Sequence, residues 1–290
     1  MTMTAHPHVE TFFDEATNTF SYVVRDPASA ACAVVDSVLD FDYASGAISH
    51  ASADRIIQYI RDNKLVLEWL IETHVHADHL SAAPYIQKIL GGKIGIGAGI
   101  RIVQETFGKV FNEGTEFQRD GSQFDRLFED DDSYAIGTLP VTVLHTPGHT
   151  PACMTHVAGD AAFVGDTLFM PDGGTARADF PGGDARTLYR STRRVLDLPP
   201  ETRLFMCHDY GPNGRQILNE TTVAEQRAHN IHVHDGISED EFVRLRTERD
   251  ATLAMPRLIL PSLQVNMKAG ALPEPEDNGR SYLKIPINAF

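Results

Sequence analysis

The sequence has few cysteines, and it has no long apolar run. Cys32, Cys153 and Cys207 are the only cysteines in 290 residues, and no two of them form a C-x-x-C pair. A disulfide framework and a zinc ribbon are therefore not expected, and a reducing compartment fits. No apolar stretch approaches the roughly 20 residues of a membrane helix, and residues 1–10 lack the pattern of a secretory signal. We expect a cytoplasmic protein that does not bind a membrane.

Basic residues are also scarce relative to acidic ones. Lysine and arginine number 25 and aspartate and glutamate 40, so the formal net charge is −15. This charge argues against a nucleic-acid partner or an anionic membrane surface. An anionic substrate would need a local basic pocket. The length suffices for one large domain with an extension, or for two small domains.

Four potential metal ligands occur within six residues: His74, His76, Asp78 and His79. They follow a strand-like run at residues 65–71 and precede a helical pattern at residues 80–90. In extended backbone, residues two apart point to the same side, so His74 and His76 face one space. Asp78 and His79 would lie near the helix N-terminus and turn back toward it. The cluster favours a metal site over packed or solvated histidines.

Further expected elements alternate between strands and helices. A hairpin turns at Asp26-Pro27, and helix 52–63 begins behind Ser52 as a plausible N-cap. We expect strands at 94–96, 141–144 and 203–206, a hairpin at 154–164, and helices at 100–111, 187–196, 220–232 and 238–254. Residues 112–134 read as an acidic irregular segment and residues 256–290 as a proline-rich tail. This alternation predicts a layered α/β sandwich.

Ligand-type residues follow four of the expected strands: the group 74–79, His149, Asp166 and His208. Loops at one edge of a sheet commonly build a site, so we expect one pocket of histidines and aspartates.

This order of motifs resembles the metallo-β-lactamase superfamily, with H-x-H-x-D-H at 74–79, G-H-T at 148–150, G-D at 165–166 and a final His208. The resemblance covers about residues 15–212 and implies an αββα sandwich with the metal at the sheet edges. We therefore expect a catalytic domain at residues 1–212 and a helical extension and tail at 213–290 packed on it.

Three further features resemble the persulfide dioxygenases of that superfamily, which are similar to glyoxalase II in fold. They are the run 73–79, the segment 165–168 with Arg177, Asp179 and Phe180, and the run 208–210 followed by residues 266–270. The resemblance implies one Fe(II) per chain held by His74, His149 and Asp166, a set of two histidines and one carboxylate that leaves open positions. It implies oxidation of glutathione persulfide with O2 and water to sulfite and glutathione, and a homodimer.

The roles of His76, Asp78, His79 and His208 stay open at this point. They would surround the iron and orient its ligands, or they would form a second metal site with Zn(II). The second case would make the chain a zinc-dependent thioester hydrolase of the glyoxalase II kind. A binding module without turnover is disfavoured, because a pure binder does not need a complete ligand set.

The substrate pocket is predicted from the same resemblance. Arg177 is expected to bind a substrate carboxylate, or else simply to pair with Asp179, and Tyr210 to hydrogen-bond near the sulfur. Asn266 and Lys268 are assigned to the pocket by resemblance alone. Five other histidines and one cysteine receive structural interpretations. We expect a surface or helix-end position for His229, His232 and His234, packing or hydrogen bonding for His145 and His156, and burial without nucleophilic chemistry for Cys207.

Overall fold

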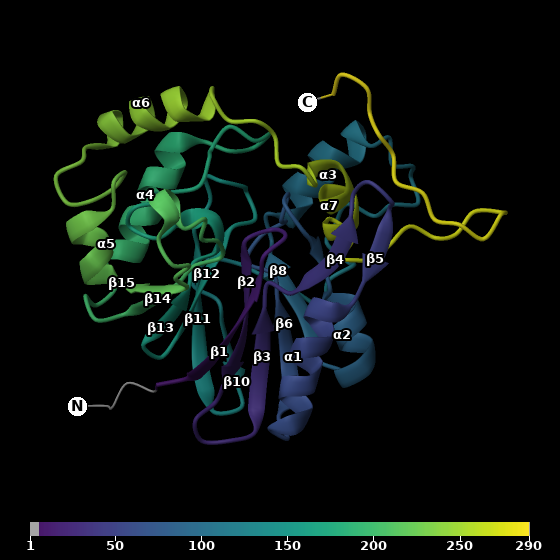
Figure 1. Ribbon diagram of the computed structural model, residues 1–290, viewed down its shortest axis with the longest axis horizontal. Helices are drawn as coiled ribbons and strands as arrows, with labels where there is room; N and C mark the ends of the chain where they lie inside the picture. Colours follow the sequence, from purple (N-terminus) through teal and green to yellow (C-terminus); the bar gives the residue numbers. More distant parts are fainter. Residues whose placement is uncertain (1–5, 290) are drawn as a thin grey trace.

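The computed structural model describes residues 6–289 and arranges them in four layers, with two sheets packed face to face between helices (Figure 1). The first sheet has the order β1-β2-β3-β6-β8-β9 and the second the order β10-β11-β12-β13-β14-β15. This is the predicted αββα sandwich.

The first sheet consists of β1 (His8–Asp14), β2 (Thr19–Arg25), β3 (Ala31–Val35), β6 (Val66–Ile71), β8 (Lys93–Gly97) and β9 (Arg126–Phe128). Its outer face packs on α1 (Ala51–Asp62), α2 (Ala83–Leu90), α3 (Ile100–Val110) and α7 (Ile259–Asn266). A small third sheet joins β4 (Val38–Asp42), β5 (Ala47–Ser49) and β7 (Leu80–Ser81).

The second sheet consists of β10 (Ser133–Ile136), β11 (Leu139–His145), β12 (Met154–Ala158), β13 (Ala161–Phe163), β14 (Arg203–Phe205) and β15 (Glu220–Thr222). Its outer face packs on α4 (Ala185–Leu196), α5 (Val223–His229) and α6 (Glu239–Asp250).

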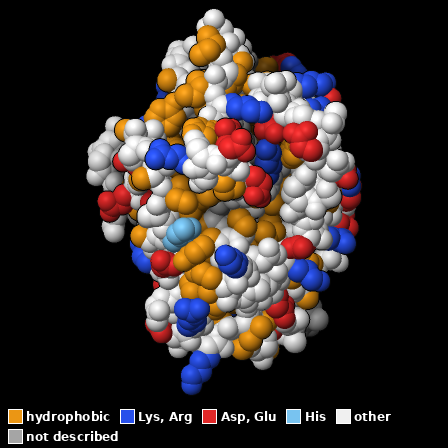
Figure 2. Space-filling view, turned by 90° about the vertical axis from the view of Figure 1, so that its right-hand side faces the viewer, with side chains coloured by type: hydrophobic (Ala, Val, Ile, Leu, Met, Phe, Trp, Pro, Cys, Tyr) orange, Lys and Arg blue, Asp and Glu red, His pale blue; other side chains and the backbone are white. Residues whose placement is uncertain are grey.

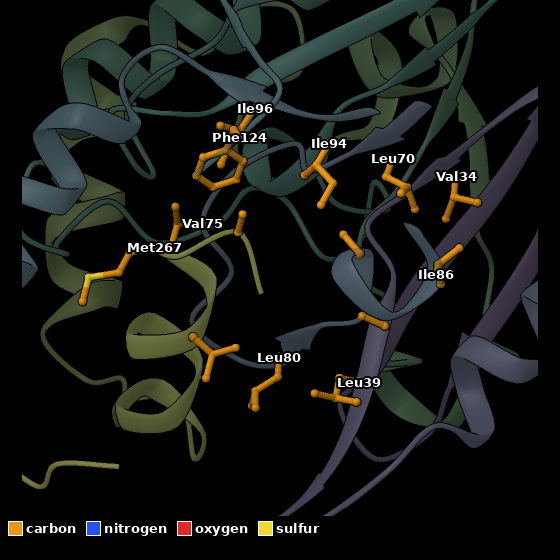
Figure 3. Close-up of a cluster of buried hydrophobic side chains, with 14 of the residues drawn as sticks. Val34, Leu39, Leu70, Val75, Leu80, Ile86, Ile94, Ile96, Phe124 and Met267 are labelled. Carbon is orange, nitrogen blue, oxygen red and sulfur yellow. The ribbon is translucent and has the colours of Figure 1, made fainter. Parts of the chain in front are cut away.

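The central strands read as nearly continuous apolar runs because both of their faces are buried. In β3, Cys32 and Val34 pack toward the helices of the first sheet, whereas Ala33 and Val35 pack toward the second sheet. Figure 3 shows the helix-side cluster, in which Val34 and Leu70 from the strands lie with Ile86 of α2 and with Met267 just after α7. The alternation of side chains along one strand thus supplies residues to both hydrophobic clusters.

Several sequence expectations need correction. The segment 112–134 contains β9 and the start of β10, and the tail contains α7. Helix α1 begins at Ala51, where Ser52 is not the N-cap and its hydroxyl bonds Asp40 instead. Strand β7 and Ala82 separate Asp78 and His79 from α2, so these two residues do not lie at a helix N-terminus. Residues 220–222 form β15 before α5 begins.

The extension beyond residue 212 contributes to both halves of the sandwich. Strand β15 extends the second sheet, α6 packs against α4, and α7 contacts β7 beside the first sheet. The domain boundary at residue 212 stays a prediction.

The last part of the tail leaves the body of the sandwich, and its Ile285 and Ile287 are highly exposed. Figure 2 shows the face that carries this tail, where hydrophobic side chains lie among charged ones of both signs. None of the helices within residues 6–289 has the length and apolarity of a membrane-spanning segment.

Candidate metal centre

The loop between β6 and β7 carries four of the predicted ligands and is anchored by its apolar residues. Val75, Ala77 and Leu80 are buried in the core on the helix side of the first sheet, and Figure 3 shows Val75 and Leu80 in that cluster. The intervening His74 and His76 are also buried, with their ring centroids 4.1 Å apart. Core packing of alternate residues therefore brings both imidazoles to one side.

The other three ligand-type residues follow strands of the second sheet and converge on this loop. His149 follows β11, Asp166 lies in a short 3-10 turn after β13, and His208 follows β14. Asp166 Oδ2 lies 3.9 Å from His74 Nε2 and 3.6 Å from His149 Nε2. Its Oδ1 lies 3.4 Å from His208 Nε2. The structure thus brings the four predicted strand ends to one centre.

Gly165 sets the position of Asp166. Its φ is +50°, and a Cβ added there would lie 2.6 Å from Thr73 Oγ1. Glycine adopts this left-handed conformation at no steric cost, and its lack of a Cβ leaves room for the threonine. The Thr73 hydroxyl donates to Asp36 and accepts a hydrogen bond from His74 Nδ1 at 3.1 Å. Close approach of the two loops therefore also orients His74.

Buried polar atoms without a hydrogen-bond partner lie at this centre. Among the described residues they include His74 Nε2, His76 Nδ1, His79 Nε2, His208 Nε2 and Asp166 Oδ1. Such groups cost free energy when buried without a partner. Metal cations bound within these ligand groups would give such atoms partners, so the donor set fits a metal.

In His149 and His208, the ring nitrogen that points away from the centre is hydrogen-bonded to the protein. These bonds determine which ring nitrogen faces the centre. His149 Nδ1 bonds the Arg177 carbonyl at 2.8 Å, and His208 Nδ1 bonds the Asn18 carbonyl at 3.1 Å. Because a carbonyl only accepts, both Nδ1 atoms carry the proton and both Nε2 atoms are free. Outer hydrogen bonds of this kind are typical of metal-binding histidines.

Burial and neighbouring charges also set the protonation of the site. Burial, reinforced by neighbouring histidines, holds the pKa of His74 and of His76 well below the usual value, so both stay neutral and able to bind a metal. Burial acts in the same direction on His208, but the carboxylates of Asp78 and Asp166 outweigh it and raise its pKa.

The ligand atoms form more than one group in which all atoms lie within 4.8 Å of one another. One group is His74, His149 and Asp166, and another is His76, Asp78 and His79. His76 also groups with Cys207 and His208. Oδ2 of Asp166 faces His149 and Oδ1 faces His208, so this carboxylate lies between the first group and the group that contains His208.

Asp36 is a site residue that the sequence interpretation missed. It is buried directly after β3, next to the parallel strand β6 that precedes the ligand loop. Its carboxylate accepts hydrogen bonds from the Thr73 N–H and hydroxyl, both at 2.8 Å, and bonds His76 Nε2 at 2.9 Å. The signal in the sequence that could have identified Asp36 is its position directly after an apolar strand.

A cavity of about 670 Å³ opens onto Asp78, His149, Asp166 and His208. Arg177 and Tyr210 line this cavity, and their roles in substrate binding stay predictions. Arg177 also forms the alternative ion pair, at 2.6 and 2.7 Å to the two oxygens of Asp179, and its Cζ lies 4.7 Å from the centroid of the Phe180 ring. Its guanidinium is therefore already engaged within the protein.

Asn266 and Lys268 do not line this cavity. Asn266 is buried, donates to the carbonyls of His76 and His79, and accepts from the Ser81 N–H. Lys268 forms an ion pair with Glu113 at 3.0 Å. Asn266 therefore joins α7 to the ligand loop, and Lys268 lies beside Glu113, which follows α3.

Most of the histidines given structural interpretations, and Cys207, lie as those interpretations expect, whereas His232 does not. His229 is exposed, His145 Nε2 bonds the Pro151 carbonyl at 2.9 Å, and His156 packs against Phe128 and Tyr134. Burial raises the pKa of the Cys207 thiol, which does not favour a nucleophile. His232 differs from the prediction, because it lines the cavity and accepts a hydrogen bond from the Thr175 N–H.

Comparison with known proteins identifies the family. Residues 14–208 match the Metallo-beta-lactamase superfamily. The chain is 59% identical to a probable metallo-hydrolase of Burkholderia pseudomallei, over 97% of this chain and 99% of the relative. It is 30% identical to the human mitochondrial persulfide dioxygenase ETHE1, over 89% and 87% of the two chains. The crystal structure of ETHE1 from Myxococcus xanthus superposes with a TM-score of 0.73 at 29% identity and covers 91% of this chain and 100% of its own. The chain belongs to the metallo-beta-lactamase superfamily.

Proposed function

We propose that the chain is an iron-dependent persulfide dioxygenase that converts glutathione persulfide, O2 and water to glutathione and sulfite. The observation that carries this proposal is the buried group of His74, His149 and Asp166, whose ligand atoms lie within 4.8 Å of one another. Two histidines and one carboxylate are the ligand set of non-haem iron oxygenases. The similarity to human persulfide dioxygenase over most of both chains supports the same activity.

His74, His149 and Asp166 would hold the iron, which supplies open coordination positions and redox chemistry when bound. The protein contributes a shaped cavity above these residues. Phe169, Phe180 and Tyr210 line it, and the Phe180 ring lies 5.4 Å from that of His149. These aromatic walls would hold the substrate so that its reactive sulfur is oriented toward the centre.

The first test is O2 consumption by Fe(II)-loaded protein on addition of glutathione persulfide, with metal-free protein as the blank. We expect rapid iron-dependent uptake with sulfite as product. His74→Ala and Asp166→Ala should lose both iron and O2 uptake, whereas His229→Ala, on the exposed end of α5, should keep both. Iron and activity retained in either site variant would contradict the proposal.

A zinc-dependent thioester hydrolase of the glyoxalase II kind is the second candidate, and one observation favours it. Asp166 lies between His74 and His149 on one side and His208 on the other, as a carboxylate bridging two metals would. The metallo-hydrolase name of the relative at 59% identity agrees with this candidate. Two zinc ions per chain with hydrolysis of S-lactoylglutathione, and no O2 uptake from iron-loaded protein, would select it.

A homodimer and a cytoplasmic location belong to the same proposal. Light scattering of the purified chain tests the first. Fractionation of cells that express the untagged chain tests the second.

A further inference from the structure

We propose that Arg249 and Arg257 bind the carboxylates of an anionic thiol substrate at the mouth of the cavity. This proposal rests on the proposed function for the identity of the substrate, and it concerns residues outside the matched superfamily segment of residues 14–208. Both arginines line the cavity and both are exposed. Arg249 lies near the end of α6, and Arg257 lies between α6 and α7.

The charges that line the cavity can be separated into paired and unpaired groups. Arg177 pairs with Asp179 and Arg246 with Asp250, while Asp172 and Asp209 both pair with Arg215. Asp78 and Asp166 face the histidines of the centre. Arg249 and Arg257 are the only charged residues of the lining without an ion pair among the described residues. The mouth therefore carries two uncompensated positive charges.

The positive charges of Arg249 and Arg257 each contribute to the pKa of a neighbouring residue. Burial lowers the pKa of His232 in the cavity wall to about 4, and the charges of Arg246 and Arg249 add to the shift. Outside the cavity, backbone N–H groups of Ser45 and Ala44 lower the pKa of Asp42, with a smaller contribution from Arg257. Neither effect is an ion pair, so both guanidinium groups stay available to a ligand.

The position of the arginines suits a ligand whose sulfur reaches the centre. Helix α6 packs on the second sheet and α7 on the first, and Figure 1 shows the connecting segment crossing between these two helical layers. This segment thus spans the sandwich beside the cavity. In a chain of net charge −15, an anion approaching the acidic surface requires such a local positive site. Guanidinium groups bind carboxylates through paired hydrogen bonds.

The test uses S-methylglutathione, which carries both carboxylates but no persulfide, and its dimethyl ester, which carries none. Calorimetric binding to iron-loaded protein should show that the wild type binds the acid about tenfold or more tightly than the ester. Arg249→Gln and Arg257→Gln should each weaken binding of the acid about tenfold and leave binding of the ester unchanged. The control is Arg244→Gln on the same helix, because Arg244 pairs with Glu248 and does not line the cavity.

Wild-type affinity in both Arg249→Gln and Arg257→Gln would overturn the proposal, as would an equal loss in Arg244→Gln. Iron content and thermal unfolding of each variant show whether a loss comes from misfolding. Charge-preserving Arg249→Lys and Arg257→Lys should recover part of the affinity. If the wild type consumes no O2 but the arginine variants still lose affinity for the acid, the proposed reaction fails and the carboxylate site stands.

Discussion

Asn266 connects α7 to the ligand loop, and its replacement by alanine gives the most specific prediction. Its side chain forms hydrogen bonds of 2.8 Å to the His76 carbonyl, 2.7 Å to the His79 carbonyl and 2.8 Å from the Ser81 N–H. The residue is 4% exposed. Each buried backbone group left without a partner costs about 1–3 kcal/mol. Asn266→Ala should therefore lower the free energy of unfolding by about 3–6 kcal/mol, allowing for partial relaxation.

The same change should weaken metal binding, because the three bonds hold the backbone between His76 and Ser81. Loss of outer contacts that orient ligands typically costs 10–100-fold in metal affinity. We expect a loss in that range for Asn266→Ala, measured by competition with a chelator at a temperature where the variant is folded. Asn266→Asp should also lose affinity, since a carboxylate cannot donate to the two carbonyls.

Gln264 on the same helix provides a matched control. It is 3% exposed and also forms three hydrogen bonds, to the Leu260 carbonyl and to the carbonyl and N–H of Lys284. Gln264→Ala should lower stability but leave metal affinity unchanged, because its partners are in α7 and the tail. The reasoning fails if Asn266→Ala binds the metal as tightly as the wild type, or if Gln264→Ala loses as much affinity.

Three further predictions follow from other contacts. Burial raises the pKa of Asp26, but hydrogen bonds, led by the Thr138 N–H, outweigh burial and lower that pKa to about 2. The free energy of unfolding should therefore fall by about 2 kcal/mol between pH 4 and pH 2. Acid unfolding of Asp26→Asn should lack this loss. Asp179→Asn and Arg177→Gln should each destabilise the protein by about 1–3 kcal/mol in denaturant melts, because each removes one partner of the same ion pair. A loss in only one of the two variants would argue against the pair. Tyr210→Phe should keep its iron and its melting temperature but lower kcat/KM about tenfold. The reason is that the Tyr210 hydroxyl has no hydrogen bond among the described residues, and its proposed partner is the substrate. Unchanged kinetics would remove Tyr210 from the site.

The convergence of the ligand groups was predictable because each follows a short apolar strand. The sequence periodicity places the strands, and the rule that loops at one sheet edge build a site brings the groups together. The positions of β9, β10 and α7 were not predictable in the same way. β9 and β10 have three and four residues and lie at sheet edges, where few apolar residues mark a strand. Pro261 lies in the first turn of α7, where proline is tolerated, although it suggests an irregular tail in the sequence.

The pocket assignments were less predictable because they depend on pairing between distant side chains. Arg177 and Lys268 have the chemistry of anion-binding residues, but Asp179 and Glu113 already neutralise them. Arg249 lies in a polar helix and Arg257 in a proline-containing connection, and the sequence interpretation assigned neither residue a role. The sequence contains all four positive charges, yet only the fold shows which of them lack a carboxylate partner.

Asp36 shows how the chemistry of the ligand loop depends on another strand. Its φ of +52° after β3 is typical of a turn, and its partners Thr73, His76 and Cys207 are 37 to 171 residues away in the sequence. Parallel pairing of β3 with β6 places its carboxylate beside the loop. Because a carboxylate accepts, His76 carries its proton on Nε2 and leaves Nδ1 free toward the centre. The nitrogen that His76 offers to a metal is therefore determined by a residue that no ligand motif contains.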